Sequence, residues 1–179
     1  MKIRFLVCFC LAIASVRAED VLKDSTINRF YKNNRQFLEA SAEKMPADKY
    51  DFKLTPAQMS FGEWINHSTE RNYVDCSALR GETNPMPKAE TDMLKGKDVI
   101  AKNLKESFEY CDATFAKLDD QKILSSQQMV ISFLHIVVHN NEIYGNIVGY
   151  MRASGITPPS TEMMNSMRGK KSSAKGLLM

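Results

Sequence analysis

Histidine occurs only three times in this chain, and two of the three are spaced for one face of a helix. His135 and His139 lie four residues apart in an apolar run, and His67 lies far upstream. Residues four apart are neighbours on a helix surface. Three neutral imidazole nitrogens meeting from two helices would leave one or two positions open on a divalent ion, as in a catalytic metal site. The three histidines are therefore the candidate metal ligands, with zinc or nickel as the candidate ion.

Two glutamates follow site histidines at the same interval, as His67-x-x-Glu70 and His139-x-x-Glu142. A carboxylate in such a place can orient an imidazole, supply a missing ligand, or act as a general base on metal-bound water. Glu70 and Glu142 are therefore candidate catalytic residues. The alternative is that both are ordinary exposed carboxylates on a helix. His135 has an alternative as well, because a histidine in an apolar helix is more often a hydrogen-bonded core residue than a ligand.

Apolar periodicity predicts four long helices, at about 22–44, 60–81, 97–118 and 125–155. Ser60 and Glu63 have the spacing of a capping box, as do Ser125 and Gln128, and Gly155 followed by two prolines ends the last helix. Four amphipathic helices of this length favour an all-α four-helix bundle. The connection containing residues 83–87 is long enough to cross an end of the bundle, so a simple up-and-down order of helices does not follow.

Two stretches carry a resemblance to a known family. They are residues 45–81, with MPADKYDFKLTP at 45–56 and SFGE leading into His67, and residues 133–159, with His139, YGN at 144–146 and GITPP at 155–159. Together they resemble the exported bacterial members of the DinB-like superfamily, over about residues 25–159. The resemblance implies a four-helix bundle with one long crossover and a metal held by one histidine of the second helix and two of the last. Some relatives are thiol-dependent transferases or isomerases, and many have no assigned reaction.

The chain departs from that family pattern at one position. Relatives carry the last two ligands as histidines four apart, and His139 matches the first of them, whereas Ile143 occupies the place of the second. His135 lies on the same helix face but about 6 Å away along the axis. Either the third ligand is missing, or His135 supplies it with a shifted metal.

The first 18 residues read as a secretory signal peptide. Lys2 and Arg4 precede an apolar run from Phe5 to Val16 that is too short to span a bilayer, and Ala18 ends a plausible cleavage site. We therefore expect an exported protein, periplasmic or secreted, with no membrane span after cleavage. The domain then occupies residues 19–159.

Charge argues against a nucleic-acid partner. Three of the 24 basic residues lie in 1–18, so residues 19–179 carry 21 basic and 21 acidic residues. Residues 160–179 hold four basic residues against Glu162, which leaves a net charge of about −3 on 19–159. No basic face of the kind that nucleic acids require is visible. We expect residues 160–179 to be a disordered basic tail.

Cys76 and Cys111 are the only cysteines after the apolar leader. In an oxidising compartment they could form a disulfide, and they are equally explained as two small buried side chains. The spacing leaves both open.

Two function classes remain. The first is a metal-dependent enzyme, hydrolase-like or transferase-like, that acts on a small-molecule substrate. The second is a non-catalytic exported bundle that lost its third ligand at Ile143 and binds a small molecule or a protein partner. The sequence leaves a homodimer open.

Overall fold

The computed structural model describes the backbone of residues 26–176 and the side chains of residues 27–169, and the expected signal peptide lies outside this range. The described part is all-α, with no β-strand between residues 26 and 176, which confirms the prediction that the fold is all-α. The elements in chain order are α2 (Thr26–Lys44), the 3-10 helix η1 (Ala47–Lys49), α3 (Phe61–Arg80), α4 (Lys88–Thr91), α5 (Lys97–Phe115), α6 (Asp120–Ile123), α7 (Gln127–Ala153) and α8 (Pro159–Gly176).

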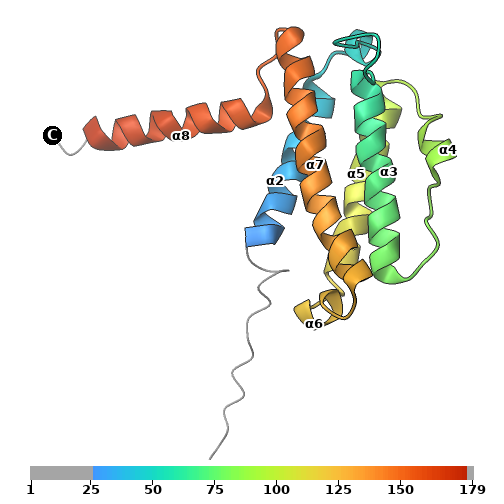
Figure 1. The fold of residues 1–179 in the computed structure, drawn as a ribbon. Coiled ribbons are helices and arrows are strands. Elements are labelled where there is room, and N and C mark those ends of the chain that lie inside the picture. The colour runs from blue at the N-terminus through green and yellow to red at the C-terminus, as the bar shows by residue number, and fades with distance from the viewer. Residues whose placement is uncertain (1–25, 177–179) are drawn as a thin grey trace, which may run out of the picture.

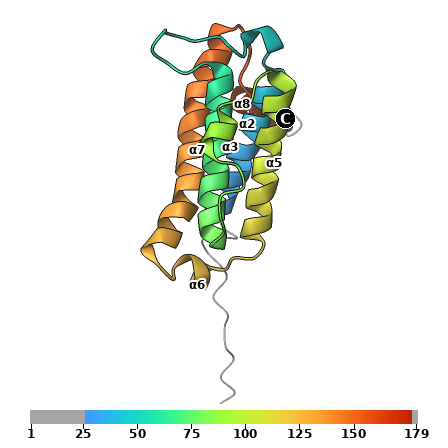
Figure 2. The same cartoon turned by 90° about the vertical axis from the view of Figure 1, so that its right-hand side faces the viewer.

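Four of the helices, α2, α3, α5 and α7, lie side by side around a common core (Figures 1 and 2). Helix α3 contacts α5 and α7, and α2 contacts the same two helices, so the contacts close a ring. The largest side chains with almost no exposed surface come from all four helices, and include Leu38, Phe61, Phe108 and Tyr150. Burial of these apolar surfaces supplies the main driving force for assembling the helices.

The directions in which the helices run explain why the connection between α3 and α5 is long. Arg80 near the end of α3 bonds to Thr114 near the end of α5, so these two helices run parallel. Trp64 early in α3 bonds to Tyr150 late in α7, so α3 and α7 are antiparallel. The connection at 81–96 must therefore run from one end of the helices to the other, and it carries α4 along the outside of α3 (Figure 1). We call residues 81–96 the crossover.

Local capping signals set the ends of α3 as predicted. The Ser60 side chain accepts a hydrogen bond from the Glu63 amide at 3.2 Å, and the Glu63 carboxylate accepts one from the Ser60 amide at 2.6 Å. The hydrogen bond from Ser60 lowers the pKa of Glu63. At the other end Gly81 has φ 69°, which glycine adopts without strain. In α7 the cap is Ser126, which accepts from the Met129 amide, and not the predicted Ser125 with Gln128.

Replacing Ser60 by alanine should lower the free energy of unfolding by about 1 kcal/mol, because the Glu63 amide then loses its partner. Urea unfolding followed by circular dichroism measures this change. Thr55→Ala, which removes an exposed side-chain hydrogen bond to Gln58, is the control and should stay within about 0.5 kcal/mol of the parent. Equal stability of the two variants would show that the cap contributes nothing.

A disulfide joins α3 to α5 in the middle of the core. Cys76 and Cys111 are fully buried, their Cα atoms are 5.4 Å apart, and their sulfurs are bonded. The Cα separation lies in the usual range for a disulfide. Of the two alternatives that the sequence left open, the structure has the bridge.

Polar side chains with no more than 4% of their surface exposed form a second connection between helices, one turn from the disulfide. Asn72 on α3 donates to the Ser107 hydroxyl on α5 at 3.0 Å and accepts from the Asn140 amide on α7 at 2.8 Å. The Ser68 hydroxyl donates to the side-chain oxygen Oδ1 of Asn140 at 2.6 Å. Because each bond joins different helices, this network fixes their relative register.

Residues 160–176, which we predicted to be disordered, are helical in the structure. Pro159 occupies the first helical position, where a proline loses no hydrogen bond. The Ser160 amide donates to the Tyr144 oxygen at 3.0 Å, and Glu162 pairs with Lys44. These contacts anchor the start of α8, which then extends away from the other helices (Figure 1). Within residues 26–176, no helix combines the length and apolar character needed to cross a bilayer.

Candidate metal centre

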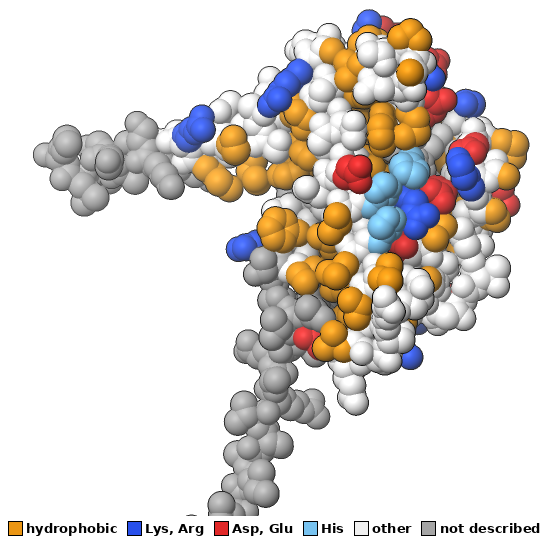
Figure 3. Space-filling model, viewed as in Figure 1, with side chains coloured by type: hydrophobic (Ala, Val, Ile, Leu, Met, Phe, Trp, Pro, Cys, Tyr) orange, Lys and Arg blue, Asp and Glu red, His pale blue; other side chains and the backbone are white. Residues whose placement is uncertain are grey.

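His67 on α3 and His139 on α7 face each other through their outer ring nitrogens. Their Nε2 atoms are 2.9 Å apart, and the rings meet edge to face with an interplanar angle of 89°. The side chains are 28% and 20% exposed, so the pair lies near the surface between the two helices. The histidines form one cluster on the outer face of the molecule (Figure 3).

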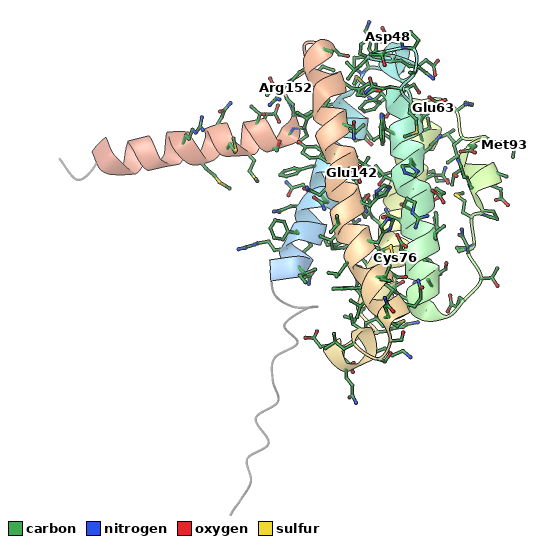
Figure 4. All side chains as sticks on the ribbon, in the orientation of Figure 1. Asp48, Glu63, Cys76, Met93, Glu142 and Arg152 are labelled. Carbon is green, nitrogen blue, oxygen red and sulfur yellow. A yellow bond between two sulfur atoms is a disulfide. The ribbon has the colours of Figure 1, made fainter. Side chains whose placement is uncertain are left out.

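Each of these two histidines has a carboxylate beside its other ring nitrogen. Glu70 Oε2 lies 3.4 Å from Nδ1 of His67, and Glu142 Oε2 lies 3.2 Å from Nδ1 of His139. Glu142 projects from the solvent side of α7 (Figure 4) and is 67% exposed, whereas the Glu70 side chain is 10% exposed. A carboxylate at Nδ1 favours the tautomer with the proton on that nitrogen.

This tautomer places two lone pairs against each other. If Nδ1 carries the proton in both rings, Nε2 of His67 and Nε2 of His139 are both acceptors with no hydrogen between them. Two acceptors at 2.9 Å repel each other unless a cation lies between or beside them. A metal ion or an additional proton fulfils that requirement, and metal-binding imidazoles are held by carboxylates in the same way.

Burial of His67 supports the metal-binding protonation state. Burial lowers the pKa of His67, and the neighbouring His139 lowers it further. His67 is therefore neutral near pH 7 and offers a free lone pair to an ion.

His135 lies beside the pair and is held by a different carboxylate. Its Nδ1 donates to Asp75 Oδ2 at 2.7 Å, and its ring stacks on His139 with centroids 4.7 Å apart and an interplanar angle of 13°. Within the described part of the chain, no three histidine, cysteine, aspartate or glutamate side chains are grouped so as to hold a metal ion. Of the three candidate ligands, two meet and the third flanks them.

Arg71 connects two of the carboxylates of α3, Glu70 and Asp75. Arg71 Nη1 lies 3.7 Å from Glu70 Oε1, and Arg71 Nη2 donates to Asp75 Oδ1 at 3.2 Å. With Glu142, three carboxylates lie beside the three histidines, against the one guanidinium of Arg71. This excess of negative charge favours a bound cation.

Ile143 contributes no donor and lies away from solvent. Its side chain is fully buried in the core shared by the long helices. Position 143, where a ligand histidine was expected from the resemblance, therefore serves the packing of α7 in this chain.

A cavity of about 390 Å³ adjoins His67, and His139 is not among the residues that line it. One wall is the outer face of α3, with His67, Asn66 and Glu70, and the other is the crossover, with Lys88 and Lys95. His67 thus lines the cavity and also faces His139 on α7.

Comparison with known proteins does not identify a family or an activity for this chain. No family model, curated protein or solved structure matches the chain. The chemistry of the site must therefore be inferred from its own geometry.

Two members of the site were missed by reading the sequence. Arg71 and Asp75 follow His67 at intervals of four, and Asp75 holds His135. Their common helix face was a usable signal, since residues four apart align along one side of a helix. The two carboxylates predicted from the sequence lie within one turn of a histidine in the chain, whereas Asp75 is 60 residues from His135.

Proposed function

We propose that this protein is a metal-dependent enzyme of the DinB-like superfamily, hydrolase-like or thiol-transferase-like, with zinc or nickel held by His67 and His139. The observation that carries the proposal is the pair of Nε2 atoms facing each other at 2.9 Å, each with a carboxylate at its Nδ1. The parallel and antiparallel order of the long helices supports a four-helix bundle with one long crossover.

The side chains around the pair would divide the work as follows. His67 and His139 bind the ion, and Glu70 and Glu142 hold the two rings in the tautomer that presents Nε2. With only two protein ligands, open positions remain for water and substrate. The ion, when bound, would polarise a substrate or lower the pKa of bound water. Asp75 holds His135 against His139. With the ion bound, His135 would accept or donate a proton next to it.

The proposed setting is outside the cytoplasm, periplasmic or secreted. The leader at 1–18 motivates this, and the disulfide between Cys76 and Cys111 supports it, because disulfides persist in oxidising compartments.

The second candidate function is a non-catalytic exported bundle that binds a small molecule or a protein partner. The observation that favours it is Ile143, an apolar core residue where the family pattern has a ligand. In that case a proton shared by His67 and His139 would take the place of the metal.

Metal binding separates the two functions. Isothermal titration of zinc and of nickel into the metal-stripped, tag-free protein at pH 7.5 should show one site, with affinity falling at least tenfold in His67→Ala and in His139→Ala. His135→Ala is the matched control, since it removes the same side chain one turn away and should keep most of the affinity. Ile143→His is less informative, because it would disturb the core as well as add a donor.

Circular dichroism melts of the three variants show whether each is still folded, so that a loss of metal binding is not mistaken for a loss of folding. Absence of binding in the parent would exclude the metal site and leave the non-catalytic bundle. Equal losses in all three variants would instead make His135 a third ligand.

A further inference from the structure

The cavity beside His67 has one wall of metal-site residues and one wall of charged crossover residues. Glu70 and His67 belong to the first, and Lys88, Asp92 and Lys95 to the second. Figure 3 shows charged side chains of both signs across from the histidine cluster. A molecule in this cavity would therefore contact the proposed metal site at one end and the crossover at the other.

Most charges that line the cavity already have partners. The Glu63 carboxylate lies 3.2 Å from Lys53 Nζ, and Lys88 Nζ donates to both oxygens of Asp92 at 2.7 and 2.8 Å. Glu70 faces Arg71 on its other side. Lys95 is different, because among the described residues no hydrogen bond or ion pair is found for its ammonium group.

Asn66 fixes the backbone next to Lys95. This side chain lies on α3 with 6% of its surface exposed, and its Nδ2 donates to the carbonyl oxygen of Leu94 at 3.1 Å. Its amide oxygen is buried beside the cavity and has no hydrogen-bond partner among the described residues. A buried acceptor without a partner is uncommon, and a water or ligand donor would satisfy it. The crossover is thus tied to α3 at the residue before the unpaired lysine.

We propose that this cavity is the substrate site, and that Lys95 binds a carboxylate of a small-molecule substrate whose reacting group lies at His67. The inference rests on the proposed metal function and names the substrate class for that site. One unpaired ammonium group matches the single charge of a carboxylate, whereas a phosphate monoester carries up to two. A volume of about 390 Å³ suits a small organic acid.

Two hydroxamates of the same chain length test the proposal on the zinc-loaded protein. Succinohydroxamate ends in a carboxylate and butyrohydroxamate ends in a methyl group, and both chelate zinc through the same hydroxamate. Titration should show the carboxylate probe binding about fivefold more tightly, the scale of one solvent-accessible ion pair. Because the chelating group is shared, the ratio of the two affinities cancels changes in the metal site itself.

Variants at position 95 then locate the preference. Lys95→Gln should bring the ratio of affinities close to one, and Lys95→Arg should keep the preference. Lys102→Gln is the matched control, because Lys102 is an exposed lysine on α5, 3.7 Å from Glu106, and the ratio should stay as in the parent.

The outcomes distinguish failure of the carboxylate site from failure of the proposed metal-dependent function. If zinc does not bind, the proposed function fails and this inference with it. If zinc binds but neither probe does, or the parent shows no preference, or the preference survives Lys95→Gln, the carboxylate site is excluded while the metal site stands.

Discussion

Replacing Asn72 by alanine is expected to lower the free energy of unfolding by roughly 3–5 kcal/mol. Asn72 is fully buried and bridges three helices, since it donates to Ser107 at 3.0 Å and accepts from Asn140 at 2.8 Å. Truncation leaves a buried hydroxyl and a buried amide without one partner each, at about 1–3 kcal/mol per group. The lost side-chain volume adds a small cavity within a closely packed core.

Equilibrium urea unfolding of the parent and the variant measures this loss. Asn103→Ala is the control, because Asn103 is a partly exposed asparagine of α5 that bonds only to its own helix at Val99. It should change stability by no more than about 0.5 kcal/mol. A loss at Asn72 as small as that at Asn103 would show that the buried network does not hold the helices together.

Removing the disulfide with the double variant Cys76→Ala and Cys111→Ala should cost about 3–4 kcal/mol. The bridge closes a loop with a sequence separation of 35, and the chain-entropy relation gives this range for such a loop. The melting temperature should fall by roughly 7–15 °C, at about 2–4 °C per kcal/mol for a chain of this size.

Thermal melts with and without reductant check the assignment to the disulfide. Reductant should destabilise the parent and leave the double variant unchanged. Thiol titration of denatured, unreduced protein that starts after residue 18, and so lacks Cys8 and Cys10, should find no free thiol. Two free thiols, or a parent insensitive to reductant, would rule out the bridge.

Local features of the sequence predicted the helices well. Apolar residues at intervals of three and four located α3, α5 and α7, and the Ser60 and Glu63 pair and Gly81 set the ends of α3. These signals succeed because caps and amphipathic faces depend on residues within one or two turns of each other. The start of α8 escaped prediction because its anchors, Tyr144 and Lys44, lie far away in the chain.

The site was predicted only in part, because its geometry depends on contacts between helices. The structure brings His67 and His139 together, with their Nε2 atoms 2.9 Å apart. The choice of Asp75 as the partner of His135 requires the register of α3 against α7, which the buried asparagine and serine contacts determine. The cavity could not be foreseen either, since it depends on where the crossover lies along α3.

The position of the disulfide also changes what the crossover has to do. Cys76 lies before the crossover and Cys111 lies after it, so the two halves of the chain are joined twice, once by peptide bonds and once by sulfur. A cut anywhere in 81–96 would leave a single covalent molecule. Lengthening the crossover is also inexpensive, because doubling a flexible loop costs only about 0.6 kcal/mol. The part of the crossover before α4 is thus free to change in length and sequence, while Asn66 still holds Leu94 and the disulfide still links the chain on both sides.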